Sequence, residues 1–276
     1  MQSVITLGRT APRAAIWLRA ASTKGPLKED WKKDMVYFYQ FPRPGTGLPN
    51  LSPFCLKVET FLRANQINHE IVDSMRIVRN SPRGLLPFVE LNGQQIADSQ
   101  VIVWELQKHF QLDDKLEGAD RGTARAVERM VEMSTNYALL DDKFTNNMDS
   151  FPQPKAKPVK TPSFLDRIMG KKPKKPVTPL AMVRKRVSSA FGKLSQAEQK
   201  ELMRRDIRAL DDILGDKKFL FGDHITSVDC SVFGQLAAVY YLPHPQQLNN
   251  LLDGDFPRVR AYCDRIRQHY YPEWKS

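Results

Sequence analysis

The chain contains one short stretch, Gly84-Leu-Leu-Pro87, that directly precedes a β-rich run interrupted by Asn92-Gly93. Proline has no backbone N–H and cannot donate to a strand ladder, so Pro87 must stand at the first residue of a strand or at a bend before it. Asn-Gly is the dipeptide that best closes a two-residue hairpin. The stretch therefore predicts a bend at Pro87 and then two paired strands, residues 88–91 and 94–97.

The size of the chain and its cysteines narrow the class of protein. A chain of 276 residues can form one large or two ordinary domains with real cores. Its three cysteines are widely spaced and odd in number, so they predict neither a disulfide framework nor a zinc site: Cys55, Cys230 and Cys263. The five histidines show no ligand spacing either, and we expect no metal site. No run approaches the roughly 18 apolar residues of a membrane-spanning helix.

The net charge of +11 is concentrated in two segments. Residues 1–28 carry five cations and no acid, and residues 151–180 carry seven lysines and Arg167 against Asp166 alone. The remainder of the chain is nearly neutral. A nucleic-acid-binding protein normally places its charge on a folded face with aromatic residues for stacking. We therefore expect no nucleic-acid partner.

The first part of the chain, residues 1–34, is expected to be a leader outside the folded domains. Up to about Pro26 it is rich in arginine and hydroxyl residues and free of acids, which is typical of a mitochondrial presequence. A disordered tail without a targeting role explains the same composition. The expected location is accordingly cytoplasmic or mitochondrial.

Residues 35–112 predict an α/β domain with the order β-α-β-(α)-β-β-α. Met35 to Phe41 is β-branched and aromatic, and Ser52-Pro53 supplies an N-cap and a first-turn proline for a helix. His69 to Asp73 is a second short strand. The hairpin follows, and Ser99 to Phe110 has the apolar spacing of a helix.

Residues 113–276 are helical in character. Predicted helices cover about 123–145, 180–190 and 195–214. Ser195 and Glu198 have the spacing of a capping box, and Thr226 and Asp229 have it again before an apolar helix at 230–241. Residues 150–180 hold seven prolines and form a basic loop or insertion. The composition favours a solvated loop, and contact of its lysines and the Phe164–Met169 piece with acidic lipid headgroups is the alternative.

These motifs together resemble one family. The Pro87 hairpin, Ser52-Pro53-Phe54-Cys55, the Thr226–Asp229 box and the closing Tyr270–Trp274 segment are similar to the failed axon connections and metaxin-related branch of the glutathione S-transferase superfamily. The resemblance implies an N-terminal thioredoxin-like domain followed by an all-helical C-terminal domain. Nematode cadmium-responsive proteins share the pattern, so a cadmium response is a further expectation.

The resemblance also implies a glutathione site. In that fold the bond before Pro87 is cis, and the main chain of Leu86 pairs with the cysteinyl amide of glutathione. Asp98 and Ser99 correspond to the acidic-Ser pair that binds the γ-glutamyl end. Ser52 stands where transferases carry the residue that contacts the glutathione sulfur, and its hydroxyl at a helix N-terminus can lower the pKa of a thiol.

Each of these residues also has a purely structural explanation. Ser52 and Ser99 can serve only as helix caps. Cys55 lacks a Cys-x-x-Cys partner, because Ser52 holds the first position, and is expected to be a buried spacer. Gln40 stands roughly where tyrosine-type transferases carry their catalytic phenol, which argues against that chemistry.

Two functions follow from the resemblance. The first is a protein that binds glutathione as co-substrate or ligand, without a metal, and has weak transferase or detoxification activity through Ser52. The second is a non-catalytic scaffold or adaptor that acts through protein partners or as a homodimer, in axon development or in metaxin-like mitochondrial protein import.

Overall fold

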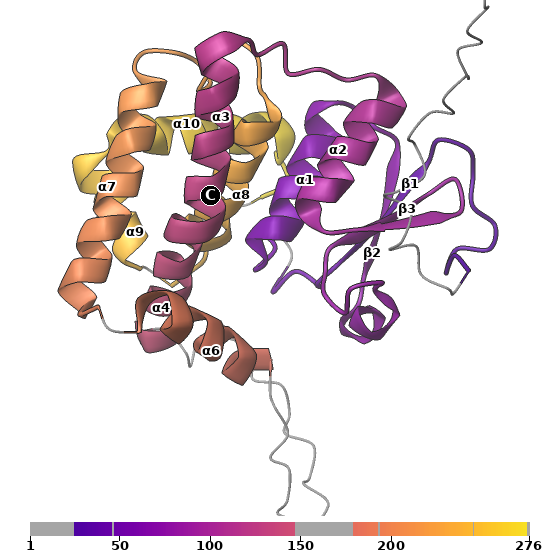
Figure 1. The fold of residues 1–276 in the computed structure, drawn as a ribbon, viewed down its shortest axis with the longest axis horizontal. Coiled ribbons are helices and arrows are strands. Elements are labelled where there is room, and N and C mark those ends of the chain that lie inside the picture. The colour runs from indigo at the N-terminus through magenta and orange to yellow at the C-terminus, as the bar shows by residue number, and fades with distance from the viewer. Residues whose placement is uncertain (1–24, 46, 147–178, 193, 245, 275–276) are drawn as a thin grey trace, which may run out of the picture.

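The computed structural model describes residues 25–45, 47–146, 179–192, 194–244 and 246–274. Most of the expected leader and of the basic insertion, including its Phe164–Met169 piece, lies outside the described residues. The described part has an α/β domain on one side and a helical domain on the other (Figure 1), which confirms the predicted fold class.

The N-terminal domain is built on a four-stranded sheet with the order β2-β1-β3-β4. β1 (Val36–Gln40) runs parallel to β2 (His69–Asp73) and antiparallel to β3 (Phe88–Leu91), and β3 pairs with β4 (Gln94–Ala97). The hairpin is confirmed, with Asn92 and Gly93 at φ 50° and 77° as such a turn requires.

Two helices join the sheet to the second domain. α1 (Pro53–Ala64) and α2 (Ser99–Phe110) pack against each other and stand between the sheet and the helical domain (Figure 1). Both begin where the sequence predicts them. A 3₁₀ segment, η1 (Met75–Asn80), connects β2 to the loop before β3.

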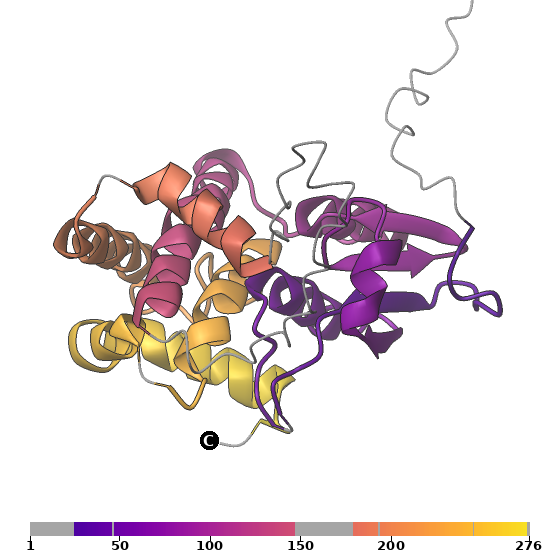
Figure 2. The same ribbon diagram turned by 90° about the horizontal axis from the view of Figure 1, so that it is seen from below.

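The C-terminal domain surrounds one apolar helix. α8 (Ser227–Tyr240) is buried along almost its whole length. The remaining elements pack around it or against its neighbours (Figures 1 and 2): α3 (Gly118–Arg129), the π-helical η2 (Met130–Thr135), α4 (Asn136–Asn146), α6 (Pro179–Phe191), α7 (Gln196–Leu214), α9 (Gln247–Asn250), the π-helical η4 (Leu251–Asp255) and α10 (Pro257–Tyr270).

The helix expected over about 123–145 differs from the observed segment. The structure starts it a turn earlier, at Gly118, and places η2 between α3 and α4. Gly118 and Gly122 are weak helix formers and hid the first turn from a propensity argument. Both predicted capping residues are present: Glu198 accepts from the N–H of Ser195, and Asp229 accepts from that of Thr226.

The C-terminal segment fastens the two domains to each other. The hydroxyls of Tyr271 and Thr60 are 2.8 Å apart, and Arg63 of α1 donates to Tyr270 O at 2.6 Å and to Glu273 at 2.7 Å. The Arg63 guanidinium also lies 4.3 Å from the centre of the Tyr271 ring. Within the described ranges no helix has both the length and the apolar character needed to span a bilayer.

α1 and α8 cross at Gly234. A Cβ at that position would lie 2.7 Å from Pro53 O and 2.8 Å from Lys57 N. These are backbone atoms, which cannot move aside as a flexible side chain can. Gly234 therefore permits the close approach of the two domains' central helices.

We predict that Gly234→Ala lowers the free energy of unfolding by about 1–3 kcal/mol, because the added methyl group forces α1 and α8 apart. Urea denaturation monitored by circular dichroism measures the change. Gly122→Ala is the matched control: this exposed helical glycine has nothing within 4 Å of its Cβ position, and the change should leave stability unchanged or raise it by up to about 1 kcal/mol. Equal stability of the two variants would contradict the prediction.

A candidate ligand site at one edge of the sheet

The strand register brings three loops to one edge of the sheet. Tyr39 pairs with Phe88, and Phe88 pairs with Ala97, so these three residues form one row across β1, β3 and β4. The chain leaves β1 beyond this row toward Ser52, enters β3 from Pro87, and leaves β4 toward Asp98. The residues predicted from the sequence therefore belong to neighbouring loops.

Ser52 sits on a turn fixed by buried amides. Its Oγ accepts from Cys55 N–H at 3.3 Å as the N-cap of α1, and its own N–H donates to Asn50 Oδ1 at 2.9 Å. The Asn50 side-chain amide donates in turn to Gln40 Oε1 at 3.1 Å and to Phe41 O. Gln40 and Asn50 are both buried. Through Asn50, Gln40 thus fixes the turn that leads into α1. Gln40 therefore has a structural role at the place where the resemblance led us to look for a catalytic tyrosine.

The tyrosines of β1 are turned to other partners. The hydroxyl of Tyr39 donates to Glu90 at 2.7 Å, and burial together with that carboxylate raises the pKa of Tyr39. The hydroxyl of Tyr37 accepts from Lys32 N–H at 2.9 Å. Neither phenol is placed to polarise a ligand beside Ser52.

Cys55 is fully buried in the first turn of α1. Burial raises its thiol pKa to about 12, although the hydrogen bond with Ser52 works in the opposite direction. Because the thiolate is the reactive form of cysteine, this thiol is inert at neutral pH. Cys230 and Cys263 are also buried, with thiol pKa values raised for the same reason.

The Leu86–Pro87 peptide bond is cis. The turn before it is held by Ser81, whose hydroxyl donates to Leu85 O, and by Gly84, whose N–H donates to Ser81 O at 3.1 Å. Gly84 has φ 68°, which favours glycine. Leu86 itself is buried and precedes the first paired residue of β3, so its main chain lies outside the ladder.

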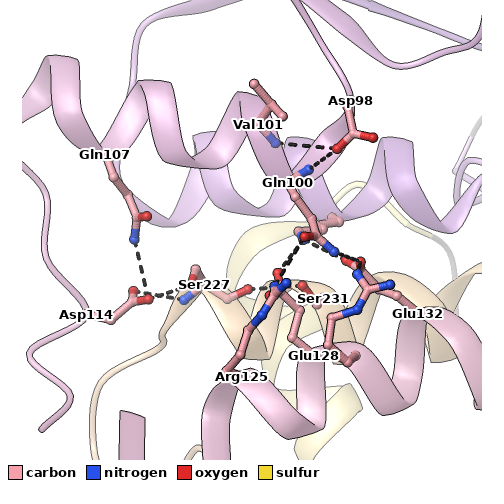
Figure 3. A network of polar contacts seen from close by, with 12 residues as sticks. Asp98, Gln100, Val101, Gln107, Asp114, Arg125, Glu128, Glu132, Ser227 and Ser231 are labelled. Atoms are coloured by element: carbon pink, nitrogen blue, oxygen red, sulfur yellow. Dashed lines mark hydrogen bonds and ion pairs between the residues drawn. The ribbon is translucent and has the colours of Figure 1, made fainter. Parts of the chain in front are cut away.

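Asp98 has an unusual backbone conformation at the start of α2. Its φ of 86° and ψ of 126° fall where non-glycine residues are strained by about 1–3 kcal/mol, and such residues cluster at functional sites. Its Oδ1 accepts from Gln100 N–H at 3.0 Å and Val101 N–H at 3.4 Å (Figure 3). Its Oδ2 lies 3.6 Å from the Arg83 guanidinium. Ser99 is buried as the first residue of the helix.

A buried charge network lies behind the N-terminus of α2. Lys57 of α1 donates to Glu132 at 2.6 Å and to Glu128 at 2.8 Å, across the domain boundary. The side-chain amide of Gln100 donates to Glu132 and accepts from Arg125 at 3.2 Å (Figure 3). Burial alone would raise the pKa of Glu128, but Lys57 and Arg125 outweigh it and the pKa is lowered.

A second set of polar contacts ties the other end of α2 to the same domain. Asp114 accepts from Ser227 N–H at 2.9 Å and from the Ser227 hydroxyl, and Gln107 donates to it at 3.4 Å (Figure 3). α2 is therefore fixed at both ends, and the backbone of Asp98 and Ser99 is held by the helical domain as well as by the sheet.

Sequence reasoning did not identify Arg83, Gln100 or the Lys57 network. Arg83 directly precedes Gly84, and its charge was the only signal in the sequence that could have singled it out. Lys57 and Glu132 are 75 residues apart, and no local pattern connects them. Within the described residues no group of His, Cys, Asp and Glu side chains is arranged to hold a metal ion.

Two open grooves occur at the far end of α1, away from Ser52. They have volumes of about 560 and 690 Å³ and share Ala64, His269 and Tyr270. α1 is about 18 Å long, and Ser52 caps its opposite end. These grooves do not belong to the candidate site.

The edge of the sheet offers groups suited to a small zwitterionic peptide. Two helix N-termini, at Ser52 and Ser99, supply partial positive charge for an anion. Asp98 carries a carboxylate, which can pair with an ammonium group, and within the described residues no hydrogen bond uses the N–H of Leu86. Such a set of groups can bind a short peptide, with the Ser52 hydroxyl at one end of the site.

We predict that Lys57→Met lowers the free energy of unfolding by about 3–5 kcal/mol, because Glu128 and Glu132 lose the buried cation that they share and keep only the more exposed Arg125 and Arg129. Lys57→Met combined with Glu128→Gln should cost less than the sum of the single changes. Urea denaturation at neutral pH measures both. Lys108→Met, at an exposed lysine of α2, is the control and should change stability by less than about 0.5 kcal/mol.

The pH dependence gives a second readout of that experiment. A carboxyl whose pKa is lowered on folding stabilises the native state above its ordinary pKa, and this stability is lost as the pH falls through the lowered value. The difference in the free energy of unfolding between the wild type and Glu128→Gln should therefore be greatest at neutral pH and should disappear in acid. Additive losses with no such pH dependence would contradict the network's role.

The chain is similar in sequence to several proteins. It is 30% identical to Failed axon connections of Drosophila melanogaster over 261 aligned residues. The alignment covers 90% of this chain and 60% of that protein. It is 28% identical to an isoprene-epoxide–glutathione S-transferase of Rhodococcus sp. (strain AD45), covering 82% of this chain and 96% of that one. It is 24% identical to human Metaxin-2, covering 89% and 92%.

The fold has close counterparts among solved structures. The β-etherase of Sphingobium sp. strain SYK-6 superposes with a TM-score of 0.59 at 18% identity, covering 84% of this chain and 94% of that one. At this identity the likeness concerns the fold alone.

Two family profiles match two separate segments of the chain. The Glutathione S-transferase N-terminal domain matches residues 53–150, and the Glutathione S-transferase C-terminal domain matches residues 203–266. Together with the thioredoxin-like and helical domains and the relatives above, these matches identify the chain as a member of the glutathione S-transferase superfamily, related to the failed axon connections and metaxin proteins.

Proposed function

We propose that this protein binds reduced glutathione at the edge of the sheet and carries a weak glutathione transferase activity. The observation that carries the proposal is the convergence of three loops, bearing Ser52, Leu86-Pro87 and Asp98-Ser99, beyond one row of paired residues. The Rhodococcus relative, which is named as a glutathione S-transferase, supports the same ligand.

Each end of the tripeptide has a partner in this arrangement. The γ-glutamyl α-ammonium pairs with the Asp98 carboxylate, and its α-carboxylate accepts from the hydroxyl and the N–H of Ser99, because the next two N–H groups of α2 already donate to Asp98. The cysteinyl amide pairs with the main chain of Leu86, next to Pro87. Arg83 lies 3.6 Å from Asp98, and the ligand ammonium displaces it from this carboxylate.

Ser52 acts on the thiol. Its Oγ accepts from Cys55 N–H and still carries a proton that it can donate. A hydrogen bond to sulfur at the N-terminus of α1 favours the thiolate, and the thiolate is the form that attacks an electrophile. No cation in the described residues is bonded to Ser52, so this activation is modest, which fits a weak transferase.

The second candidate function is a non-catalytic scaffold that works through protein partners or as a homodimer, in axon development or in metaxin-like mitochondrial import. The similarity to human Metaxin-2 over 89% of the chain favours it. So does the fact that Ser52 and Asp98 already serve as helix caps and need no ligand. In this case the protein is cytoplasmic or mitochondrial, and residues 150–180 contact a membrane surface.

We predict that isothermal titration with reduced glutathione gives micromolar to low-millimolar binding. Asp98→Asn should weaken it by about tenfold to a hundredfold, because the charge that pairs with the ammonium is lost. Asparagine is as good an N-cap as aspartate and tolerates positive φ, so α2 remains folded. Ser52→Gly should retain binding and lose transferase activity, since glycine replaces a serine cap at a cost of only a few tenths of a kcal/mol.

The outcomes separate the two functions. Absence of heat with the wild type would refute glutathione binding and leave the scaffold. Binding that is equal in wild type and Asp98→Asn would refute the assigned contact. Asp113→Asn, on the exposed linker after α2, is the matched control and should bind as the wild type does.

We further predict that residues 1–24 fused to a fluorescent protein are delivered to mitochondria, because this segment is basic and free of acids. Microscopy with a mitochondrial dye measures the delivery. A fusion in which Arg9, Arg13 and Arg19 are replaced by glutamine should remain diffuse. A diffuse signal from the unaltered segment would reject a targeting role.

A further inference from the structure

The last part of the expected leader docks on the sheet, so the leader does not extend to residue 34 as the sequence predicted. We call residues 27–34 the strap. The N–H groups of Leu27 and Lys28 donate to the Glu90 carboxylate at 2.6 and 3.1 Å. The Lys28 ammonium lies 5.4 Å from the centre of the Tyr37 ring, and Lys32 N–H donates to the Tyr37 hydroxyl. The strap thus covers the sheet face that carries Tyr37 and Glu90.

Glu90 is the anchor of this contact. It lies in β3, in the middle of the domain, and is completely buried. Besides the two strap N–H groups, its oxygens accept from the Tyr39 hydroxyl at 2.7 Å and the Gln95 amide at 2.8 Å. No ion pair to Glu90 is found among the residues that the structure describes, so hydrogen bonds alone balance its charge. The strap contributes half of those bonds.

The other end of the strap closes on the hairpin. Asp34 N–H donates to Asn92 Oδ1 at 2.8 Å, and the Asn92 amide donates back to Asp34 at 3.2 Å. The same carboxylate lies 2.7 Å from His109 Nε2 of α2. The Trp31 ring covers the turn so closely that a Cβ on Gly93 would lie 3.0 Å from its Nε1. The strap is therefore held at both ends by specific contacts.

The targeting features precede the strap in the sequence. Arg9, Arg13 and Arg19 all come before residue 20, and the strap contains no arginine. A presequence could consequently be removed without touching the contacts to Glu90. A cut beyond Lys28 would remove both main-chain donors and leave a buried carboxylate short of partners, which is strongly unfavourable.

We propose that the strap is a permanent part of the folded protein and sets the downstream limit of proteolytic processing. An endopeptidase hydrolyses one peptide bond before Leu27: water adds across the amide, and a carboxylate and a new α-ammonium group are formed. The cleavage rests on the targeting role proposed above for the leader, whereas the structural role of the strap does not.

The strap is tested with two truncated chains, one beginning at residue 25 and one at residue 35, each preceded by an initiator Met. We expect the first to unfold in urea at the same midpoint as the full chain. We expect the second to unfold at a clearly lower midpoint, with its unfolding equilibrium constant raised at least about tenfold. Equal midpoints for the two truncated chains would overturn the proposal.

The variant Glu90→Gln separates two causes of the stability lost with the strap: the under-paired Glu90 carboxylate and the lost contact area. With the strap present, this change should destabilise the protein, because charge-assisted hydrogen bonds become neutral ones. Without the strap, it should restore part of the lost stability, because the under-paired charge disappears. The same effect of Glu90→Gln in both chains would refute the anchor role. Glu105→Gln, at an exposed glutamate of α2 that makes no hydrogen bond or ion pair with the described residues of the strap, is the matched control.

Processing is tested by intact-mass measurement of the full chain, tagged at its C-terminus and isolated from mitochondria of expressing cells. We expect a mature N-terminus at or before residue 27. A folded mature chain beginning at residue 28 or later would overturn the limit. A full-length chain found only in the cytosol would refute the cleavage and the targeting role together, while the result with the truncated chains would still stand.

Discussion

The close contact of α1 with α8 is the constraint on which the remaining structure depends. Gly234 lets the backbones of the two helices approach each other closely. Lys57, one turn into α1, forms ion pairs with Glu128 and Glu132 of the other domain. Tyr271 and Glu273 hold the same helix through Thr60 and Arg63. Because α1 begins at Ser52, the geometry of the candidate site depends on a contact between domains rather than on the sheet alone.

The candidate site shows how one set of atoms can serve folding and recognition. A helix N-terminus has unpaired N–H groups, which a side-chain oxygen or a bound anion can satisfy. Ser52 and Asp98 satisfy them in this structure, so their presence alone is no argument for a ligand. The backbone of Asp98 is different. A cap requires no residue with φ of 86°, and the sheet, Arg83 and the network around Gln100 together hold it there.

Local signals in the sequence were sufficient for the elements around the site. Asn92-Gly93 defined the hairpin, and Ser52-Pro53 defined the start of α1, because turn and cap preferences depend on a few adjacent residues. The contacts that position the site could not be found in this way. Lys57 meets Glu132 across 75 residues, and Leu27 meets Glu90 across 63. No local sequence pattern marks these residues as partners, and only the fold brings them together.

The placement of the cysteines has a practical consequence. Cys55 and Cys230 lie in the core of the first domain, although Cys230 belongs to α8, and Cys263 lies in the core of the second. A thiol-modifying reagent can reach them only when the packing around them opens. The chain therefore carries natural reporters of its own unfolding: Cys55 and Cys230 report on the domain boundary, and Cys263 alone reports on the helical core. The rate of alkylation at each thiol measures how often the packing around it opens.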